Sequence, residues 1–176
     1  MPVAEAEWLK SLIRDIPDFP RQGIVFKDIT PLLANREAFS FTVTQICEHF
    51  SGDRIDKVLG IEARGFIFAA PAAVSFGAGF VPVRKPGKLP HQIEREEYEL
   101  EYGTDLLEIH RDAVSPGERV LIVDDVVATG GTAAATCRLV EKLGGEIAGV
   151  ACVVELGFLK GRDRLERVNL FSLISY

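Results

Sequence analysis

The stretch VLIVDDVVATGGT, residues 120–132, decides the fold class of this 176-residue chain. Its first four residues are apolar, which is typical of a strand buried on both faces of a parallel sheet. Asp124 and Asp125 follow directly, and a turn that contains Gly130 and Gly131 comes shortly after them. One short stretch therefore combines two negative charges with a turn whose composition suits an anion.

Segments typical of strands and of helices alternate along the rest of the chain. Their patterns predict helices at 4–16, 36–50, 65–77 and 132–144, and strands at 57–61, 79–83, 106–109 and 146–156. Residues 16–33 contain three prolines and Gly23, so no regular element is expected there. The alternation predicts an α/β fold, in which a central parallel sheet is flanked by helices on both faces.

Residues 84–105, RKPGKLPHQIEREEYELEYGTD, differ from the rest in being highly charged and poor in core-forming side chains. A segment of this length inside a compact domain is typical of a lid or a binding loop, or else of a disordered segment. Tyr98, Leu100 and Tyr102 alternate with glutamates in its second half. This alternation predicts a small hairpin with one apolar face.

The composition limits the class of protein. With 47% hydrophobic residues, the chain can bury the core of one domain. Its net charge of -6 argues against binding to nucleic acid, and no apolar run reaches the length of a membrane span. We expect no signal peptide, buried thiols in a reducing cytoplasm, and no zinc site, because the cysteines and histidines lack the spacing of metal ligands.

The glycine turn is suited to a phosphate group. Because it precedes a predicted helix, its backbone N–H groups can point at one anion, and the helix dipole adds to the attraction. Gly130 and Gly131 permit close approach of the backbone, and Thr129 and Thr132 add hydroxyl donors. No lysine follows the glycines, so the turn is not the P-loop of nucleotide hydrolases, and the G-x-G-x-x-G fingerprint of dinucleotide-binding domains is absent as well.

The whole stretch closely resembles the binding motif for phosphoribosyl pyrophosphate (PRPP) in type I phosphoribosyltransferases. This resemblance explains the mixed charges, because the ligand presents a 5-phosphate, a ribose diol and a pyrophosphate with Mg²⁺. It implies that Asp124 and Asp125 accept hydrogen bonds from the diol and favour positive charge at the anomeric carbon. It further implies that Mg²⁺ is carried by PRPP and not by a cage of protein ligands. The residues that it assigns to the 5-phosphate are Ala128, Thr129, Gly130, Gly131 and Thr132.

Segments along the entire chain resemble the members of this family that act on adenine. They include GIEARGFIFAAPAA at 60–73, VPVRKPGKLP at 81–90, YELEYGTDLLEI at 98–109 and VVELGFLKGRDRL at 153–165. The resemblance implies transfer of the 5-phosphoribosyl group from PRPP to N9 of adenine, giving AMP and pyrophosphate. It also implies a cytoplasmic homodimer of single-domain subunits, each with a hood formed by residues 1–34 and 156–168 and a lid at about 84–105.

Several further site residues are implied by the same resemblance. Glu101 would protonate or hydrogen-bond N7 of the purine, and Tyr102 would lie in the closed lid near the pyrophosphate. Many relatives have arginine where this chain has Lys27. The pyrophosphate contacts would be Arg64, Arg84, Lys85 and Lys88; the purine would lie between Phe26 and Leu159, and the backbone of Val25 and Lys27 would read its edge.

Other interpretations of the same residues stay open. The enzyme could act on a 6-oxopurine such as hypoxanthine, guanine or xanthine, or the chain could be a regulator that binds PRPP without turnover. Arg64 could be a surface arginine, and Glu101 could be one of several exposed strand carboxylates. Phe26 and Leu159 could be ordinary core residues.

Overall fold

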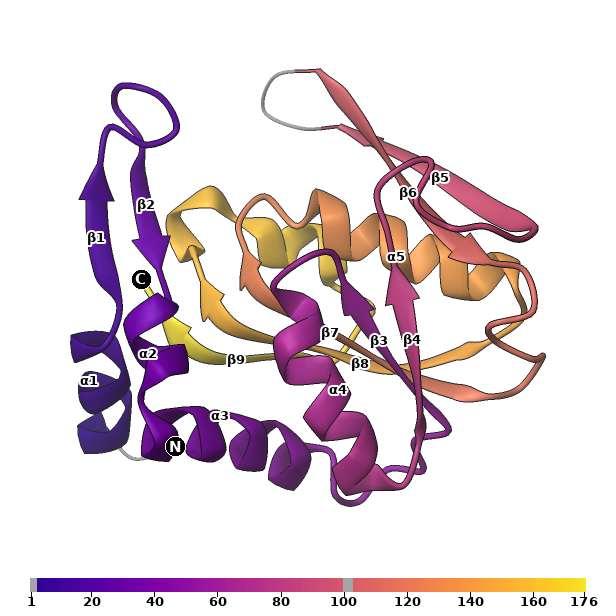
Figure 1. Cartoon of the computed structure of the whole chain (residues 1–176), viewed down its shortest axis with the longest axis horizontal. Helices are drawn as coiled ribbons and strands as arrows, with labels where there is room; N and C mark the ends of the chain where they lie inside the picture. The colour runs from indigo at the N-terminus through magenta and orange to yellow at the C-terminus, as the bar shows by residue number, and fades with distance from the viewer. Residues whose placement is uncertain (1–2, 100–102) are drawn as a thin grey trace.

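The computed structural model describes residues 3–99 and 103–176 (Figure 1). The helices are α1 (Val3–Ser11), α2 (Thr30–Ala34), α3 (Arg36–His49), α4 (Gly65–Phe76) and α5 (Gly131–Lys142), with two 3-10 helices, η1 (Gly157–Leu159) and η2 (Gly161–Leu165). The strands are β1 (Arg14–Pro17), β2 (Val25–Asp28), β3 (Lys57–Ile61), β4 (Gly79–Val83), β5 (Ile93–Glu99), β6 (Thr104–His110), β7 (Arg119–Val127), β8 (Glu146–Glu155) and β9 (Leu170–Ser175). Within these ranges, no helix combines the length and apolar character that a membrane span requires.

Five parallel strands form the central sheet in the order β4-β3-β7-β8-β9. Numbered by their sequence within this sheet, the strands run 2-1-3-4-5, which is a doubly wound arrangement in which the order of the strands reverses between β3 and β7. Ligands of such folds bind outside the carboxyl ends of the strands at this switch point. Because Gly60 pairs with Val123, residues 62–64 and residues 124–125 emerge side by side at that edge.

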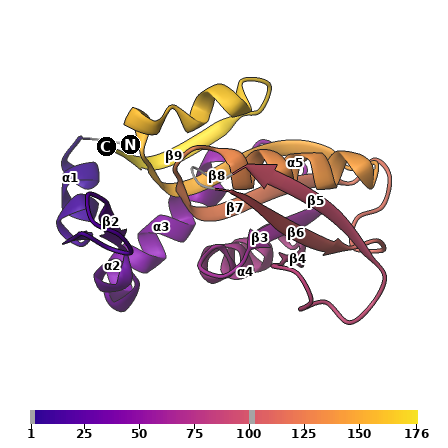
Figure 2. The same cartoon turned by 90° about the horizontal axis from the view of Figure 1, so that it is seen from above.

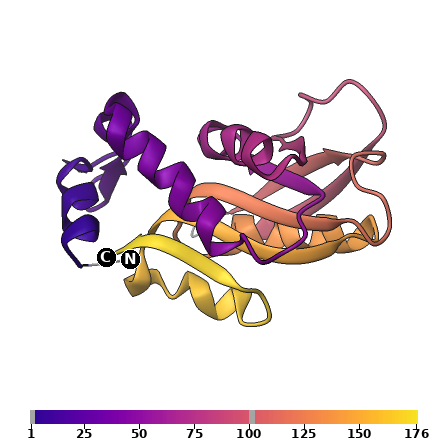
Figure 3. The same ribbon diagram turned by 90° about the horizontal axis from the view of Figure 1, so that it is seen from below.

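The side chains of β7 alternate between two cores, as predicted for a strand buried on both faces. Leu121 and Val123 belong to the core beneath α3 and α4, whereas Val120 and Ile122 belong to the core beneath α5. Figures 2 and 3 show α3 and α4 on one face of the sheet and α5 on the other. The predicted α/β fold with helices on both faces is therefore confirmed.

The prediction of one helix over residues 4–16 is wrong. The helix α1 ends at Ser11, and the strand that follows pairs with β2 in antiparallel register, placing Ile16 opposite Phe26. Tertiary pairing thus overrides a helical pattern that Pro17 already weakens. Residues 16–33 are also more regular than predicted, because they include β2 and the short helix α2, in which Pro31 occupies the first turn.

A hairpin is present where one was predicted, and it is longer than expected. Of the three residues predicted to form its apolar face, Leu100 and Tyr102 lie outside the described residues. Strand β5 pairs with β6 from Ile93 opposite His110 to Glu99 opposite Thr104, so the strand expected at 106–109 is part of the same hairpin. The buried ring of Tyr98 contributes to the core on the α5 side of the sheet. Figure 1 shows the β1–β2 and β5–β6 hairpins rising on the same side of the molecule.

Candidate active site

A cavity of about 600 Å³ opens between the β1–β2 hairpin and the turn that follows β7. It joins a predominantly apolar region near β2 to the backbone of the glycine turn. The residues that line it are Pro20, Arg21, Ile24, Phe26, Val126, Val127, Ala128, Thr129, Gly130, Gly131, Thr132, Ala133, Leu156 and Leu159. All five residues predicted to bind the 5-phosphate are thus brought to one cavity.

The glycine turn presents the start of α5 to this cavity. Gly130 has a φ of 77°, a left-handed conformation that glycine adopts without a steric penalty, and α5 begins at the next residue. The N–H groups of Gly131, Thr132 and Ala133 have no acceptor within the helix, because they belong to its first turn. They can therefore converge on an anion at the positive end of the helix dipole.

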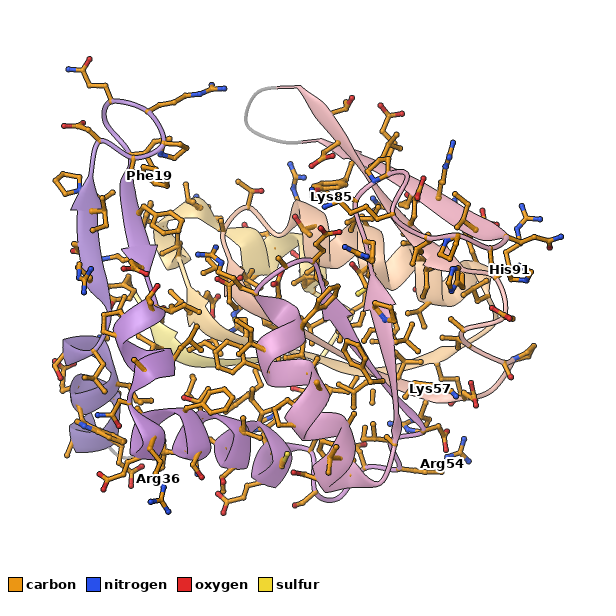
Figure 4. All side chains as sticks on the ribbon, in the orientation of Figure 1. Phe19, Arg36, Arg54, Lys57, Lys85 and His91 are labelled. Atoms are coloured by element: carbon orange, nitrogen blue, oxygen red, sulfur yellow. The ribbon has the colours of Figure 1, made fainter. Side chains whose placement is uncertain are left out.

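The apolar part of the cavity has two walls from distant parts of the chain. Phe26 comes from β2 and Leu159 from η1, and the ring of Phe19 stands edge-on to Phe26 at a centroid distance of 5.2 Å. Figure 4 shows Phe19 at the tip of the β1–β2 hairpin. A cavity that is lined by aromatic and aliphatic side chains is typical of a binding site for a small organic ligand.

Val25 and Lys27 lie on the opposite face of β2 from Phe26, as the alternation of a strand requires. Lys27 Nζ is 2.7 Å from Asp15 Oδ1 and lies over the ring of Tyr176 at 3.8 Å from its centroid. Among the described residues, the cavity lining includes neither Val25 nor Lys27. Their side chains point elsewhere, and any contact with a ligand would involve their main chain.

The two aspartates at the end of β7 are buried beside the cavity. Asp125 N donates a hydrogen bond to Asp124 Oδ1 at 2.9 Å, and the first residue of α4 is tightly packed against this pair. A Cβ on Gly65 would lie 2.7 Å from Val123 O and 3.1 Å from Asp124 Oδ1. Only glycine therefore allows the start of α4, and with it Arg64, to approach the acids so closely.

Arg64 is the cation that contacts the pair. Its Nε lies 2.8 Å from Asp125 Oδ2, but the N–H is not aimed at that oxygen, which has no hydrogen-bond partner among the described residues. The contact is an ion pair without the alignment of a hydrogen bond. Burial and the neighbouring charge of Asp125 raise the pKa of Asp124 well above its usual value, and burial also raises the pKa of Asp125, against the effect of Arg64.

A further carboxylate, Glu62, follows β3 and contacts several cationic side chains. It accepts hydrogen bonds from Arg84 Nε at 3.2 Å and from Lys85 N at 2.9 Å, and it contacts the ammonium group of Lys88. Burial alone would raise its pKa, but the bonds from Lys88, Lys85 N and Arg84 lower the pKa of Glu62 to about 2. Glu62 is thus a fully ionised centre of a compact charge network.

The four predicted pyrophosphate cations do not form one cluster. Arg84 and Lys88 meet at Glu62, whereas Arg64 faces Asp125. The ammonium group of Lys85 is turned towards the β5–β6 hairpin and lies beneath it in Figure 4, near the end where Tyr98 pairs with Asp105. There it contacts the carboxylate of Asp105 and donates to Tyr98 Oη at 2.7 Å. The predicted lid residues Glu101 and Tyr102 lie outside the described residues.

Comparison with known proteins agrees with this geometry. Residues 32–174 match the family model described as the phosphoribosyl transferase domain. Over 170 residues the chain is 58% identical to a protein of Acidobacterium capsulatum named adenine phosphoribosyltransferase, and the match covers 97% of this chain and 94% of that protein. The chain belongs to the adenine phosphoribosyltransferase family.

Solved adenine phosphoribosyltransferases have the same fold. The structure from Thermoanaerobacter pseudethanolicus superposes with a TM-score of 0.94 at 52% identity, covering 97% of this chain and 99% of the other. The Saccharomyces cerevisiae enzyme, solved with adenine and an imino-altritol bisphosphate, gives a TM-score of 0.90 at 42% identity, over 98% of this chain and 99% of the other.

Two residues of this family member were assigned no role from sequence. Glu62 stands directly after a strand and beside Arg64, and its position at a strand end was the available signal. Gly161 lies behind the glycine turn: a Cβ on Gly161 would come within 2.2 Å of Ala128 O. No local pattern could reveal the latter contact, because the two segments are about thirty residues apart.

Proposed function

We propose that the protein transfers the 5-phosphoribosyl group of PRPP to N9 of adenine, releasing pyrophosphate and forming AMP. The observation that carries this proposal is one cavity that is lined both by a helix N-terminus and by the side chains of Phe26 and Leu159, with buried carboxylates next to it. These are the three kinds of recognition that a nucleoside monophosphate requires.

The 5-phosphate would bind at residues 128–132. The N–H groups at the start of α5 supply donors, and the hydroxyls of Thr129 and Thr132 can complete the set. Because these groups are held by the fold before any ligand arrives, binding costs little ordering of the protein.

Asp124 and Asp125 would bind the ribose diol and stabilise positive charge at the anomeric carbon. Asp125 Oδ2 lacks a hydrogen-bond partner in the described part of the chain, so a sugar hydroxyl can donate to it without displacing a protein group. As the bond to pyrophosphate lengthens, negative charge at this position lowers the energy of the developing cation. Exclusion of water by a closed lid at 84–105 would protect the activated sugar.

Mg²⁺ would enter with PRPP. The described residues contain no group of three or more histidine, cysteine, aspartate or glutamate side chains that could hold the ion by themselves. The unsatisfied oxygen of Asp125 fits an outer contact to such a metal or to its water. When bound, Mg²⁺ neutralises charge on the departing pyrophosphate.

The pyrophosphate would be held by Arg64, Arg84, Lys85 and Lys88. In this structure each of these side chains faces a carboxylate, so pyrophosphate binding requires phosphate oxygens to join or replace those carboxylates. Arginine can then pair with phosphate through two parallel hydrogen bonds. Tyr102 would lie beside this site when the lid is closed.

The purine would lie between Phe26 and Leu159, and the main chain of Val25 and Lys27 would read its edge. Residues 1–34 and 156–168 would act as a hood over the base. Glu101 would donate the proton to N7 when the nucleotide is cleaved and remove it in synthesis, provided that lid closure buries the carboxylate and raises its pKa.

We further propose a cytoplasmic homodimer. Helix α4 is apolar around its circumference, yet its residue Val74 is 83% exposed, and its residue Ile67 is partly exposed. Phe80 of the neighbouring strand β4 is partly exposed as well. A second copy would cover this surface. The three cysteines are free thiols, which suits a reducing compartment.

Base specificity tests the proposal. Purified protein is assayed for pyrophosphate release from PRPP and Mg²⁺ with adenine, hypoxanthine, guanine or xanthine, and without base as a control. We expect kcat/KM for adenine to exceed that for each 6-oxopurine by about 100-fold or more, because reversed donors and acceptors leave main-chain groups unpaired. Preference for a 6-oxopurine would contradict the substrate, and PRPP binding without pyrophosphate release would indicate a regulator.

A further inference from the structure

An ion pair fixes the 3-10 segment that carries Leu159, one of the residues that line the cavity. Glu155 ends β8 and is 6% exposed. Arg162 Nε donates to its Oε1 at 2.9 Å and Nη2 to its Oε2 at 2.6 Å, while Nη1 donates to Leu170 O at 3.1 Å. The guanidinium thus fixes the 3-10 segment to both β8 and β9. Neither charged residue lines the cavity among the described residues.

The carboxylate of Glu155 is fully engaged on the side away from the cavity. Ser172 Oγ donates to Oε2 at 2.6 Å, so two different groups share that oxygen. Hydrogen bonds from Arg162 and Ser172 lower the pKa of Glu155 despite its burial. The planar guanidinium group of Arg162 pairs with the Glu155 carboxylate through two hydrogen bonds, so the pair fixes the orientation of the Arg162 side chain as well as balancing charge. An ammonium group would not fix the orientation.

The same segment touches the glycine turn through main-chain atoms. A Cβ on Gly161 would lie 2.8 Å from Gly130 N as well as 2.2 Å from Ala128 O, and a Cβ on Gly130 would lie 2.3 Å from Gly161 O. Both glycines are buried. We call the part of the cavity wall that carries Leu159 the base wall, and residues 128–132 the phosphate turn. The backbone next to the base wall is thus in direct contact with the backbone of the phosphate turn.

We propose that Arg162 and Gly161 are positioning residues that set the base wall and the phosphate turn relative to each other. The inference rests on the proposed function for the identity of the two ligand parts. Arg162 fixes where the segment runs, Leu159 projects from that segment into the cavity, and Gly161 transmits its position to residues 128–130. A displacement of the segment therefore weakens both halves of the site at once.

The experiment compares Arg162→Gln with Arg164→Gln. Arg164 lies in the same 3-10 helix, is exposed, and has no charged or hydrogen-bonded partner within the described residues. Binding of ribose 5-phosphate, which occupies the phosphate turn without the base, and of AMP is measured by calorimetry, and KM for adenine by pyrophosphate release. We expect Arg162→Gln to raise the Kd of ribose 5-phosphate and the KM of adenine by about tenfold each, with Arg164→Gln unchanged in both.

Two further variants make the outcome specific. Arg162→Lys keeps the charge but loses the fork, so it should recover only part of the loss. Gly161→Ala inserts a methyl against the turn and should weaken ribose 5-phosphate binding more than it raises the KM of adenine. If Arg162→Gln does not fold, Ser172→Ala replaces it, since it removes one hydrogen bond to Glu155; a loss of about fivefold in both constants is expected.

Wild-type constants in a folded Arg162→Gln, or in Ser172→Ala where that variant is used, would overturn the inference and leave the ion pair purely structural. A change in the adenine constant with unchanged ribose 5-phosphate binding would also overturn it, because coupling would be absent. Failure of the wild-type protein to turn over adenine would contradict the proposed function instead. The Kd values of ribose 5-phosphate and AMP would still decide whether the two parts of the site are coupled.

Discussion

Two acidic sites stand at the ends of neighbouring strands and differ in charge balance. Glu62, after β3, meets Arg84, Lys88 and a backbone N–H, which lower its pKa to about 2. Asp124 and Asp125, near the end of β7, are buried; one cation, Arg64, contacts Asp125 without the alignment of a hydrogen bond, and the pKa of each aspartate is raised. The negative charge of Glu62 is fully balanced by protein groups, whereas that of the aspartate pair is balanced only in part.

This difference separates a structural role from a ligand-binding one. A carboxylate whose lone pairs are occupied by protein donors gains little from a ligand, whereas a buried, undercompensated pair gains hydrogen bonds and charge neutralisation when a polyol or a metal arrives. Perturbed carboxylates in a cleft are candidates for function for the same reason. We therefore expect the loss of a charge to destabilise the protein at Glu62 and to stabilise the ligand-free protein at Asp124.

The largest effect is expected from Asp125→Asn. The amide cannot stabilise positive charge at the anomeric carbon, so kcat/KM for PRPP should fall by about 100-fold, with weaker ribose binding as well. Initial rates of pyrophosphate release and calorimetry with ribose 5-phosphate measure the two quantities. A variant with normal kinetics and reduced thermal stability would show that the carboxylate is structural. The exposed Asp112→Asn serves as the matched control.

The next largest effect is expected from Glu62→Gln, which should lower the free energy of unfolding. The neutral amide leaves Arg84 and Lys88 without their counter-charge; because both remain in contact with water, the loss is about 1–2 kcal/mol in the free energy of unfolding. The folded pKa lies below the usual 4.5, so this contribution is present above about pH 4.5 and is lost as the pH falls towards 2. Urea unfolding at pH 7 and pH 3 measures it.

In that experiment, the exposed Glu166→Gln is the control, and it should unfold like the wild type at both pH values. A Glu62→Gln variant that is as stable as the wild type at pH 7 would contradict the view that Glu62 is compensated by its surroundings.

Asp124→Asn should have the smallest effect on the free energy of unfolding, and its sign should be opposite to that of Glu62→Gln. The raised folded pKa means that this group favours the folded state most below its usual value of 3.8, and that this contribution declines as the pH rises through the folded pKa. Removing the charge should therefore stabilise the ligand-free protein at pH 7 by about 1 kcal/mol, while the asparagine oxygen still accepts from Asp125 N.

Urea unfolding between pH 5 and pH 8 measures this gain. We expect the difference between variant and wild type to grow with pH, since only the wild type acquires the buried charge. A difference that is constant with pH, or a destabilised variant, would show that the surrounding structure already compensates Asp124.

Features carried by contiguous residues could be predicted from the sequence. The run VLIVDD forms a strand buried on both faces, and the following glycines start a helix, because these outcomes depend on neighbours within a few positions. The helix expected over 4–16 was wrong because Arg14–Pro17 pairs with Val25–Asp28, a partner that periodicity does not reveal. The hairpin was predicted, but its full length depends on cross-strand pairing that ends at His110.

The sequence by itself determined a parallel sheet with helices on both faces, the turn that suits a phosphate and the acids next to it, since strand patterning, glycine conformation and helix starts are local properties. Only the tertiary structure decided that Phe26 and Leu159 line one cavity, that Glu62 contacts Arg84 and Lys88, and that Gly161 lies against Gly130. The physical reason is that these contacts join segments far apart along the chain, and their geometry follows from how the layers close around the core.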